Sequence, residues 1–155
     1  MPLTVVLGFG NVLLSDDGAG VHVVAQLRSE LGSDAAILID AGTLSFSLLP
    51  LIEAADSMLA IDAAELNEPP GTIALYEDAA MDQHLKSTRR RTVHEVGLMD
   101  LLDMARLHDC LPSRRALLCI QPLSIEWSES LSVPVAATVP EAGALAAALL
   151  ERWSA

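Results

Sequence analysis

The stretch LTVVLGFGNVLLSDDGAG, residues 3–20, contains the clearest signal of the fold class. Its first five residues form a mostly apolar run of the kind found in buried strands, and Gly8-Phe9-Gly10-Asn11 ends that run. From about residue 16 to residue 31, apolar side chains recur at helical spacing. A buried strand, a turn and an amphipathic helix in this order predict the opening of a parallel α/β sheet.

The rest of the chain repeats this alternation of apolar runs and helical segments. We expect further strands at residues 36–40, 58–62, 72–76 and 116–121, and further helices at 45–54, 93–108 and from 138 to the C-terminus. The last helix is expected to begin at Thr138 because Thr138-Val139-Pro140-Glu141 matches a capping box. The sequence therefore predicts a three-layer α/β/α sandwich with a mostly parallel, five-stranded central sheet, in a single domain over residues 1–155.

Composition limits the classes of function. Of the 155 residues, 52% are hydrophobic, and the formal net charge is −12. So acidic a surface repels phosphate backbones, which argues against nucleic acid as a partner. No apolar run approaches the ~20 residues that span a bilayer, and the chain does not start like a signal peptide, so we expect no membrane partner and a cytoplasmic location. Cys110 and Cys119 form no CxxC pair and indicate no disulfide framework.

An acidic pair follows the first predicted strand. In open α/β sheets, ligands bind beyond the carboxyl ends of the strands, near the switch in strand order that strands one and three usually flank. Asp16-Asp17 falls there, in what we expect to be the first turn of a helix capped by Ser15. The helix dipole alone explains carboxylates at this position. The following Gly18-Ala19-Gly20, however, leaves the backbone bare enough for another chain to approach closely.

Three further candidates, one of them weaker, are expected at or near the same edge of the sheet. Asp62 ends the third strand, where packing does not readily explain a carboxylate. Asp40 holds the matching place on the second strand, farther from the switch, and is the weaker candidate. His94 lies in a second capping box, residues 92–95, so its ring should stay neutral at a helix N-terminus and able to bind a metal. The alternative for His94 is a surface histidine at a helix start.

Two carboxylates and one neutral imidazole form a three-ligand site with open coordination positions. Such a site suits a metal that arrives with a substrate, whereas a structural zinc site has four ligands, usually with thiolates. Three polar groups in a chain of this length can also align by accident. The other histidines lie on a polar helix face (His22), in a polar loop (His84) and at a helix end (His108), each without comparable neighbours.

The stretch from Gly8 to Gly20 resembles the N-terminal signature of the hydrogenase maturation proteases, G-x-G-N-x-L-x-x-D-[DE]-x-x-G. The likeness continues over nearly the whole chain, and several ordered motifs are more specific than any one of them. The further matches are Asp40-Ala41-Gly42-Thr43 to the family's D-G-G-T, Ile61-Asp62-Ala63 to its strand-end aspartate, His94-Glu95-Val96-Gly97-Leu98 to its H-x-x-G-L segment, and Gln121-Pro122 with Trp127 to a late Q-P…W stretch.

The resemblance implies an endopeptidase that removes the C-terminal extension of a [NiFe]-hydrogenase large-subunit precursor already loaded with nickel. The family's metal-contacting positions map onto Asp17, Asp62 and His94, which would then serve both metal binding and catalysis. The nickel would be supplied by the substrate, with no resident organic cofactor, and a protease of this size could act as a monomer. Either a carboxylate base, Asp17 or Asp62, would activate the attacking water, or the nickel would polarise that water directly. The residues leave both routes open.

The chain departs from the family pattern at two positions. Position 17 is Asp where some members carry Glu, so the metal must approach more closely. Position 41 is Ala where a second Gly is usual, which matters only if that residue needs a positive φ. Arg89-Arg90-Arg91 and the segment 123–134 flank the expected site, and we expect partner-specific contacts from both; the alternative for the arginines is a solvated loop.

Three other functions compete with this interpretation. A receiver domain of the phospho-aspartate type has a similar acidic pair and strand-end aspartate, but needs a lysine after strand five, where this chain has Gln121-Pro122. A dinucleotide-binding domain needs a third glycine where Leu13 stands, and the two aspartates would repel a pyrophosphate. A non-catalytic nickel-binding maturation chaperone would use the same three ligands and differ only in lacking cleavage.

Overall fold

The computed structural model describes residues 2–32, 34–42, 46–87 and 93–155, with the side chains of residues 93–96 outside the description. Its centre is a five-stranded sheet in the order β2-β1-β3-β5-β4. The strands are β1 (Thr4–Phe9), β2 (Ile37–Gly42), β3 (Ser57–Ala63), β4 (Ile73–Glu77) and β5 (Arg114–Ile120). All neighbouring strands pair in parallel except β4, which joins β5 antiparallel. The predicted α/β class and mostly parallel sheet are confirmed.

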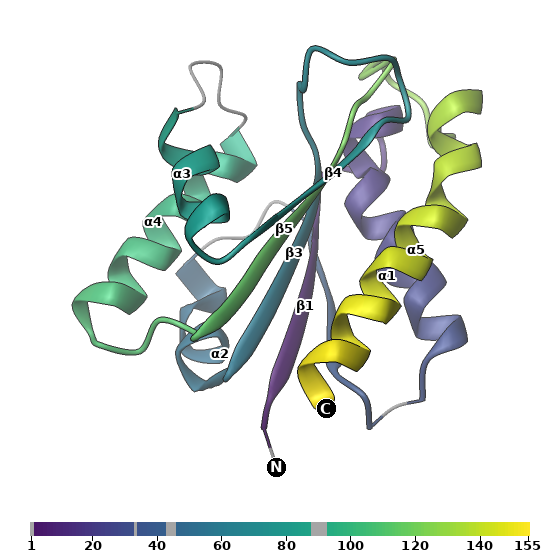
Figure 1. Ribbon diagram of the computed structural model, residues 1–155. Coiled ribbons are helices and arrows are strands. Elements are labelled where there is room, and N and C mark those ends of the chain that lie inside the picture. The colour runs from purple at the N-terminus through teal and green to yellow at the C-terminus, as the bar shows by residue number, and fades with distance from the viewer. Residues whose placement is uncertain (1, 33, 43–45, 88–92) are drawn as a thin grey trace.

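Helices cover both faces of the sheet and give the three predicted layers (Figure 1). One face carries α1 (Ala19–Glu30) and α5 (Val133–Ser154), and the other carries α2 (Leu49–Ala54), α3 (Ala79–Ser87) and α4 (Val93–Leu107). Two short 3-10 helices, η1 (Ser15–Gly18) and η2 (Phe46–Leu48), precede α1 and α2. Figure 1 also shows that β1, β3 and β5 all finish at the end of the sheet opposite the two chain termini.

The central strand β3 shows how the core positions later residues. All seven of its residues are buried. Successive side chains point to opposite faces, so Met58 and Ala60 join the apolar cluster beneath α2, α3 and α4, while Leu59 and Ile61 join the cluster beneath α1 and α5. A strand covered on both faces is expected to be continuously apolar, which is why the run at 58–61 predicted it well.

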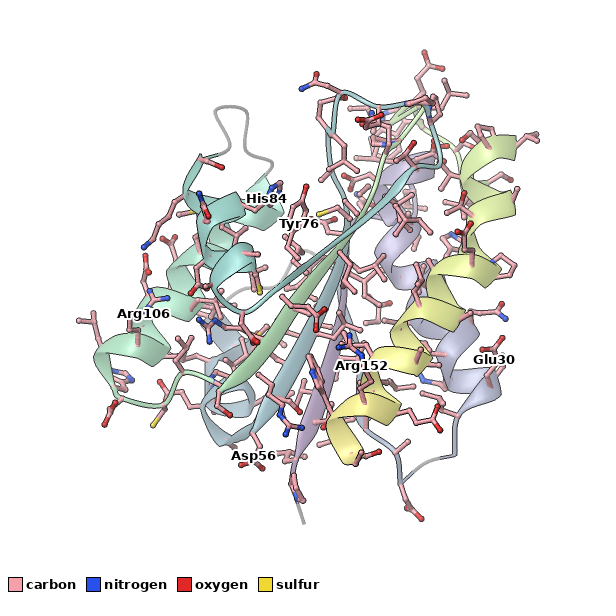
Figure 2. All side chains as sticks on the ribbon, in the orientation of Figure 1. Glu30, Asp56, Tyr76, His84, Arg106 and Arg152 are labelled. Atoms are coloured by element: carbon pink, nitrogen blue, oxygen red, sulfur yellow. The ribbon has the colours of Figure 1, made fainter. Side chains whose placement is uncertain are left out.

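Helix α3 is absent from the sequence-based prediction, which placed His84 in a polar loop. That placement is wrong: His84 lies in α3 and its ring stacks on Tyr76 of β4, with the ring centroids 4.0 Å apart (Figure 2). Burial removes water from the His84 ring and holds its pKa below the ordinary value. Only Met81 and Leu85 of α3 are buried, so its apolar pattern is too short to be recognised in a single sequence.

The predicted start of the last helix is also wrong. Helix α5 begins at Val133, with Ser132 as its N-cap residue and a proline in its first turn. Thr138 lies one turn inside the helix, where its hydroxyl contacts the carbonyl oxygens of Gly71, at 2.9 Å, and Pro134, at 3.0 Å. The hydroxyl therefore ties α5 to the turn before β4 instead of capping a helix.

Among the described residues, α5 is the one helix long and apolar enough to cross a membrane by length and composition, with 22 residues and a mean hydropathy of 1.6. The apolar face of α5 is already used inside the molecule. Val135, Ala142 and Ala146 are fully buried against α1 and the sheet. Helix α5 is therefore a core helix of the sandwich.

Candidate active site

The carboxyl ends of β1 and β3 lie side by side at the switch in strand order, as predicted. From β1 the chain crosses through α1 to β2 on one side, and β3 pairs with the other side of β1. Asp62 is the penultimate residue of β3, opposite Cys119 of β5, and its exposed fraction is 2%. By the alternation along β3, Asp62 faces the layer of α2, α3 and α4. A buried carboxylate in a central strand is costly for the fold, so its presence favours a functional role.

The two residues of the acidic pair occupy different environments. Asp16 has an exposed fraction of 0% and accepts hydrogen bonds from the backbone N–H groups of Leu123, Ser124 and Ser132, at 2.9, 3.0 and 2.7 Å. The Ser132 hydroxyl donates a fourth, at 2.7 Å. Burial alone would raise the pKa of Asp16, but these donors together outweigh it and hold the pKa below its ordinary value. Asp16 is a structural anchor for the segment between β5 and α5.

Asp17 is half-buried and remains reachable from the edge of the sheet. Its Oδ2 accepts a hydrogen bond from the Asn11 N–H at 2.8 Å, which fixes the side chain above the end of β1. The 3-10 helix η1, which carries Asp17, contacts β3, the strand of Asp62. The structure therefore brings these two predicted site residues to the same edge.

Glycines allow η1 and α1 to lie this close to the strands. A Cβ atom at Gly20 would lie 2.1 Å from the carbonyl oxygen of Ile61, the residue before Asp62. Gly10 has φ +124°, and a Cβ atom there would lie 1.8 Å from the carbonyl oxygen of Asp17. The sequence analysis explained the bare backbone at 18–20 by the approach of another chain. At Gly20 that explanation is wrong, because the backbone that approaches is the protein's own.

Ser15 does not cap the helix, contrary to the prediction. Its backbone adopts φ 49°, in the left-handed region, and its hydroxyl donates to the carbonyl oxygen of Ser130 at 2.9 Å. The N-cap residue of η1 is Leu14, without a side-chain cap. The hydroxyl therefore adds another contact to the segment that Asp16 anchors.

His94 lies in the first turn of α4, as predicted, but its side chain and Thr92 of the expected capping box lie outside the described residues. Helix α4 packs on the face toward which Asp62 points, through Leu98 and Leu101. In Figure 1, α4 begins at the end of the molecule where the parallel strands finish. Among the side chains that the structure describes, no group of three or more His, Cys, Asp or Glu is close enough to hold a metal ion; the His94 ring is not among them.

The remaining candidates are farther from the switch. Asp40 is exposed on the edge strand β2, which agrees with its place as the weaker candidate. His108 pairs with Glu53, linking α4 to α2 away from the carboxyl ends. Ala41 has no positive φ, whereas Gly42 has φ +54°, so the alanine at position 41 causes no strain. Arg89-Arg90-Arg91 lies outside the described residues.

The sequence analysis missed the role of Gln121. This side chain has an exposed fraction of 5%; its amide nitrogen donates to Glu65 at 3.0 Å and its amide oxygen accepts from the Leu66 N–H at 2.6 Å. Gln121 thereby fixes the connection that leaves β3 just after Asp62. A buried amide at the end of a central strand was the available signal, since such groups need hydrogen-bond partners.

Known proteins resemble the chain in both sequence and fold. Residues 21–149 match the family model described as hydrogenase maturation protease. The hydrogenase expression/formation protein HupD of Rhizobium leguminosarum bv. viciae is 31% identical over 98% of this chain and 76% of its own length. The hydrogenase maturating endopeptidase HybD of E. coli superposes with a TM-score of 0.89 at 28% identity, covering 97% of this chain and 93% of that one.

A second solved structure agrees with this assignment. The [NiFe] hydrogenase maturation protease HybD of Thermococcus kodakarensis superposes with a TM-score of 0.82 at 25% identity, covering 96% of this chain and 99% of that one. Matches of this extent support the protease family over the two alternatives, a receiver domain and a dinucleotide-binding domain. The chain belongs to the hydrogenase maturation protease family and is a peptidase.

Proposed function

We propose that this peptidase removes the C-terminal extension of a nickel-loaded [NiFe]-hydrogenase large-subunit precursor, and that it recognises the substrate-bound nickel through Asp17, Asp62 and His94. The observation that carries the proposal is the close packing of η1 and α1 on the end of β3, where Gly20 of α1 leaves no space for a side chain beside Ile61. That packing brings a reachable carboxylate, Asp17, to the same edge as the buried Asp62.

The two carboxylates are suited to different parts of this task. Asp62 is almost fully removed from water, so a cation that reaches it meets a charge with little screening. Asp17 is only half-buried and held by Asn11, so it can meet a metal that enters with the substrate. With a neutral imidazole from His94, the set supplies two oxygen ligands and one nitrogen ligand and leaves coordination positions open for the substrate's own ligands.

Hydrolysis requires a water molecule at the scissile carbonyl and a group that takes up its proton. Water adds to the carbonyl carbon, the base accepts one proton, and the departing amine gains a proton as the C–N bond breaks. Asp17 or Asp62 can act as the base, or the substrate's nickel can lower the pKa of the water. The nickel route makes cleavage depend on nickel directly, and the carboxylate route does so only because the trio holds the precursor through its nickel. In both cases one site would check loading and perform the cut.

The proposal also includes the location, oligomeric state and substrate class of the protein. We take the protein to act in the cytoplasm as a monomer, without a resident organic cofactor, on a protein substrate and not on nucleic acid or a membrane. The net charge of −12 supports the exclusion of nucleic acid. Membership of a protease family favours cleavage over the chaperone alternative, in which the same three ligands would bind nickel without hydrolysis.

The proposal is tested by replacing each member of the trio. Asp17→Asn, Asp62→Asn and His94→Ala should each abolish processing of nickel-loaded precursor, followed by mass spectrometry, while circular dichroism shows a folded protein. Asp40→Asn is a matched control, because Asp40 lies near the carboxyl end of β2 on the edge of the sheet, and it should process normally. Normal processing by all three trio variants would mean that the site lies elsewhere.

A further inference from the structure

Exposed apolar side chains gather in two short segments beside the proposed site. Ten large hydrophobic side chains are exposed among the described residues, and six of them belong to residues 12–13 and 123–133. Single exposed apolar side chains are normal on protein surfaces, whereas a cluster of them marks an interaction surface. We call these six the apolar rim: Val12, Leu13, Leu123, Ile125, Trp127 and Val133.

The backbone holds the two parts of the apolar rim together. The Ser128 N–H donates to the Leu13 carbonyl oxygen at 2.9 Å, and the Ser15 N–H donates to the Ser128 carbonyl oxygen at 2.8 Å. The buried Asp16 carboxylate adds its bonds to Leu123, Ser124 and Ser132. A surface fixed in this way loses little conformational entropy when a partner binds. These hydrogen bonds therefore hold the segment that carries Trp127, whose side chain is 79% exposed.

The apolar rim borders the edge of the sheet that carries the proposed site. Residues 11–17 connect β1 to α1 and carry Asp17, and residues 121–132 connect β5 to α5. In Figure 1 this second connection lies beyond the finishing ends of the parallel strands, next to the start of α5. The apolar rim therefore lies at the same end of the sheet as Asp17, within the area that a bound polypeptide can cover.

The charged residues within the two segments that carry the apolar rim are all acidic. Segments 11–17 and 121–133 contain Asp16, Asp17, Glu126 and Glu129, and no Lys, Arg or His. Glu126 and Glu129 are exposed on either side of Trp127. A partner complementary to this surface carries apolar side chains flanked by basic ones.

We infer that the apolar rim is a docking surface for an apolar, basic segment of the hydrogenase precursor, and that it binds this segment whether or not nickel is present. The inference rests on the proposed function for the identity of the partner. It adds a metal-independent contact to the nickel check: the rim holds the precursor, and the trio then examines its metal. Trp127 is the expected energetic centre, since aromatic side chains dominate interfaces of this kind.

The test measures binding and cleavage separately. Binding uses nickel-free precursor, which is not cut, with wild type and the triple variant Leu123→Ser/Ile125→Ser/Trp127→Ser. We expect Kd to rise at least about 30-fold for the triple variant and about tenfold for Trp127→Ala alone. Leu107→Ser is the matched control, because Leu107 is 83% exposed at the far end of α4, and it should bind like wild type. Unchanged unfolding temperatures show that the variants fold.

Charge is tested with Glu126→Lys/Glu129→Lys, which should weaken binding and reduce its dependence on salt. Glu151→Lys, an exposed reversal near the end of α5, is the control and should leave binding unchanged. Equal binding by wild type and the charge-reversed variant would overturn the basic character assigned to the partner segment.

Cleavage of nickel-loaded precursor separates this inference from the proposed function. We expect the triple variant to raise KM and leave kcat near that of wild type. If wild type cuts but the triple variant shows unchanged Kd and KM, the docking surface is refuted and the function stands. If wild type binds through the rim but never cuts, the function is refuted and the docking surface stands. A wild-type homodimer that the triple variant abolishes would assign the rim to a second copy and overturn the inference.

Discussion

Two regions built from adjacent residues of one acidic pair differ in almost every physical property. The anchor, Asp16 with the segment 123–132, is buried and saturated with hydrogen bonds. The proposed reactive edge, Asp17 with Asp62, places one half-buried and one buried carboxylate where β1 and β3 end. Identical side chains one residue apart thus occupy different environments because different elements pack against them, and we assign Asp16 to stability and propose Asp17 for chemistry.

The largest effect is expected when the carboxylate of Asp17 is neutralised, because this residue is assigned to the reaction and not to stability. Asp17→Asn should lower the rate of processing by roughly 100-fold or more, the range expected when a catalytic acid–base group is lost, while the free energy of unfolding stays near wild type. The measurement pairs precursor cleavage with urea unfolding. A destabilised Asp17→Asn protein with normal cleavage would place Asp17 with the anchor.

The contact that joins the two regions should be intolerant of a single methyl group. Gly20→Ala puts a Cβ atom 2.1 Å from the Ile61 carbonyl oxygen, so the start of α1 must move away from β3. We expect a loss of about 3 kcal/mol in the free energy of unfolding, measured by urea denaturation. Gly32→Ala is the matched control, because a Cβ atom there meets no atom within 4 Å. Equal stability of the two variants would contradict the close packing at Gly20.

The contribution of Asp16 to the free energy of unfolding should depend on pH. Asp16→Asn replaces an acceptor-only group with one that carries donors, so it should cost about 2 kcal/mol at neutral pH. The folded-state pKa of Asp16 is lowered, so its contribution is complete above the unfolded-state value and is lost as pH falls through the folded value. The stability gap between wild type and Asp16→Asn should therefore shrink below about pH 4. A gap that grows with acid would show that the carboxylate is not the stabilising form.

A surface ion pair far from both regions should have the smallest effect. Arg152 meets Glu77 at 3.1 Å, but the two side chains are 60% and 37% exposed (Figure 2). Arg152→Ala should change the free energy of unfolding by less than about 1 kcal/mol and leave processing unchanged. A larger loss on urea denaturation would mean that solvent screens this pair less than its exposure implies.

The fold could be predicted wherever a signal was local. The continuous apolar run at 58–61 predicted β3, and the helical spacing after residue 16 predicted α1. Helix α3 could not be predicted, because its support comes from the Asp82–Arg115 ion pair and the stack of His84 on Tyr76, contacts made only in the folded chain. Thr138 matched a capping box, yet its hydroxyl contacts Gly71, 67 residues earlier.

The site divides in the same way. The placement of Asp17 and Asp62 at one edge could be predicted, because Asp17 follows β1, Asp62 lies at the end of β3, and these two strands flank the switch in strand order. Their role in metal binding and catalysis stays a prediction. The role of Asp16 could not be predicted, because its partner Leu123 lies 107 residues away. The role of Gln121 was missed although a buried amide at a strand end offered a signal. The role of His94 stays a prediction, because its side chain lies outside the described residues.

The proposed function is tested most sharply by following the mass of a hydrogenase large-subunit precursor, nickel-loaded or nickel-free, after mixing with the purified protein. We expect a C-terminal peptide to be lost from the loaded precursor only. Cleavage of both forms at the same rate would contradict the nickel check, and binding of the loaded form without any loss of mass would contradict cleavage itself.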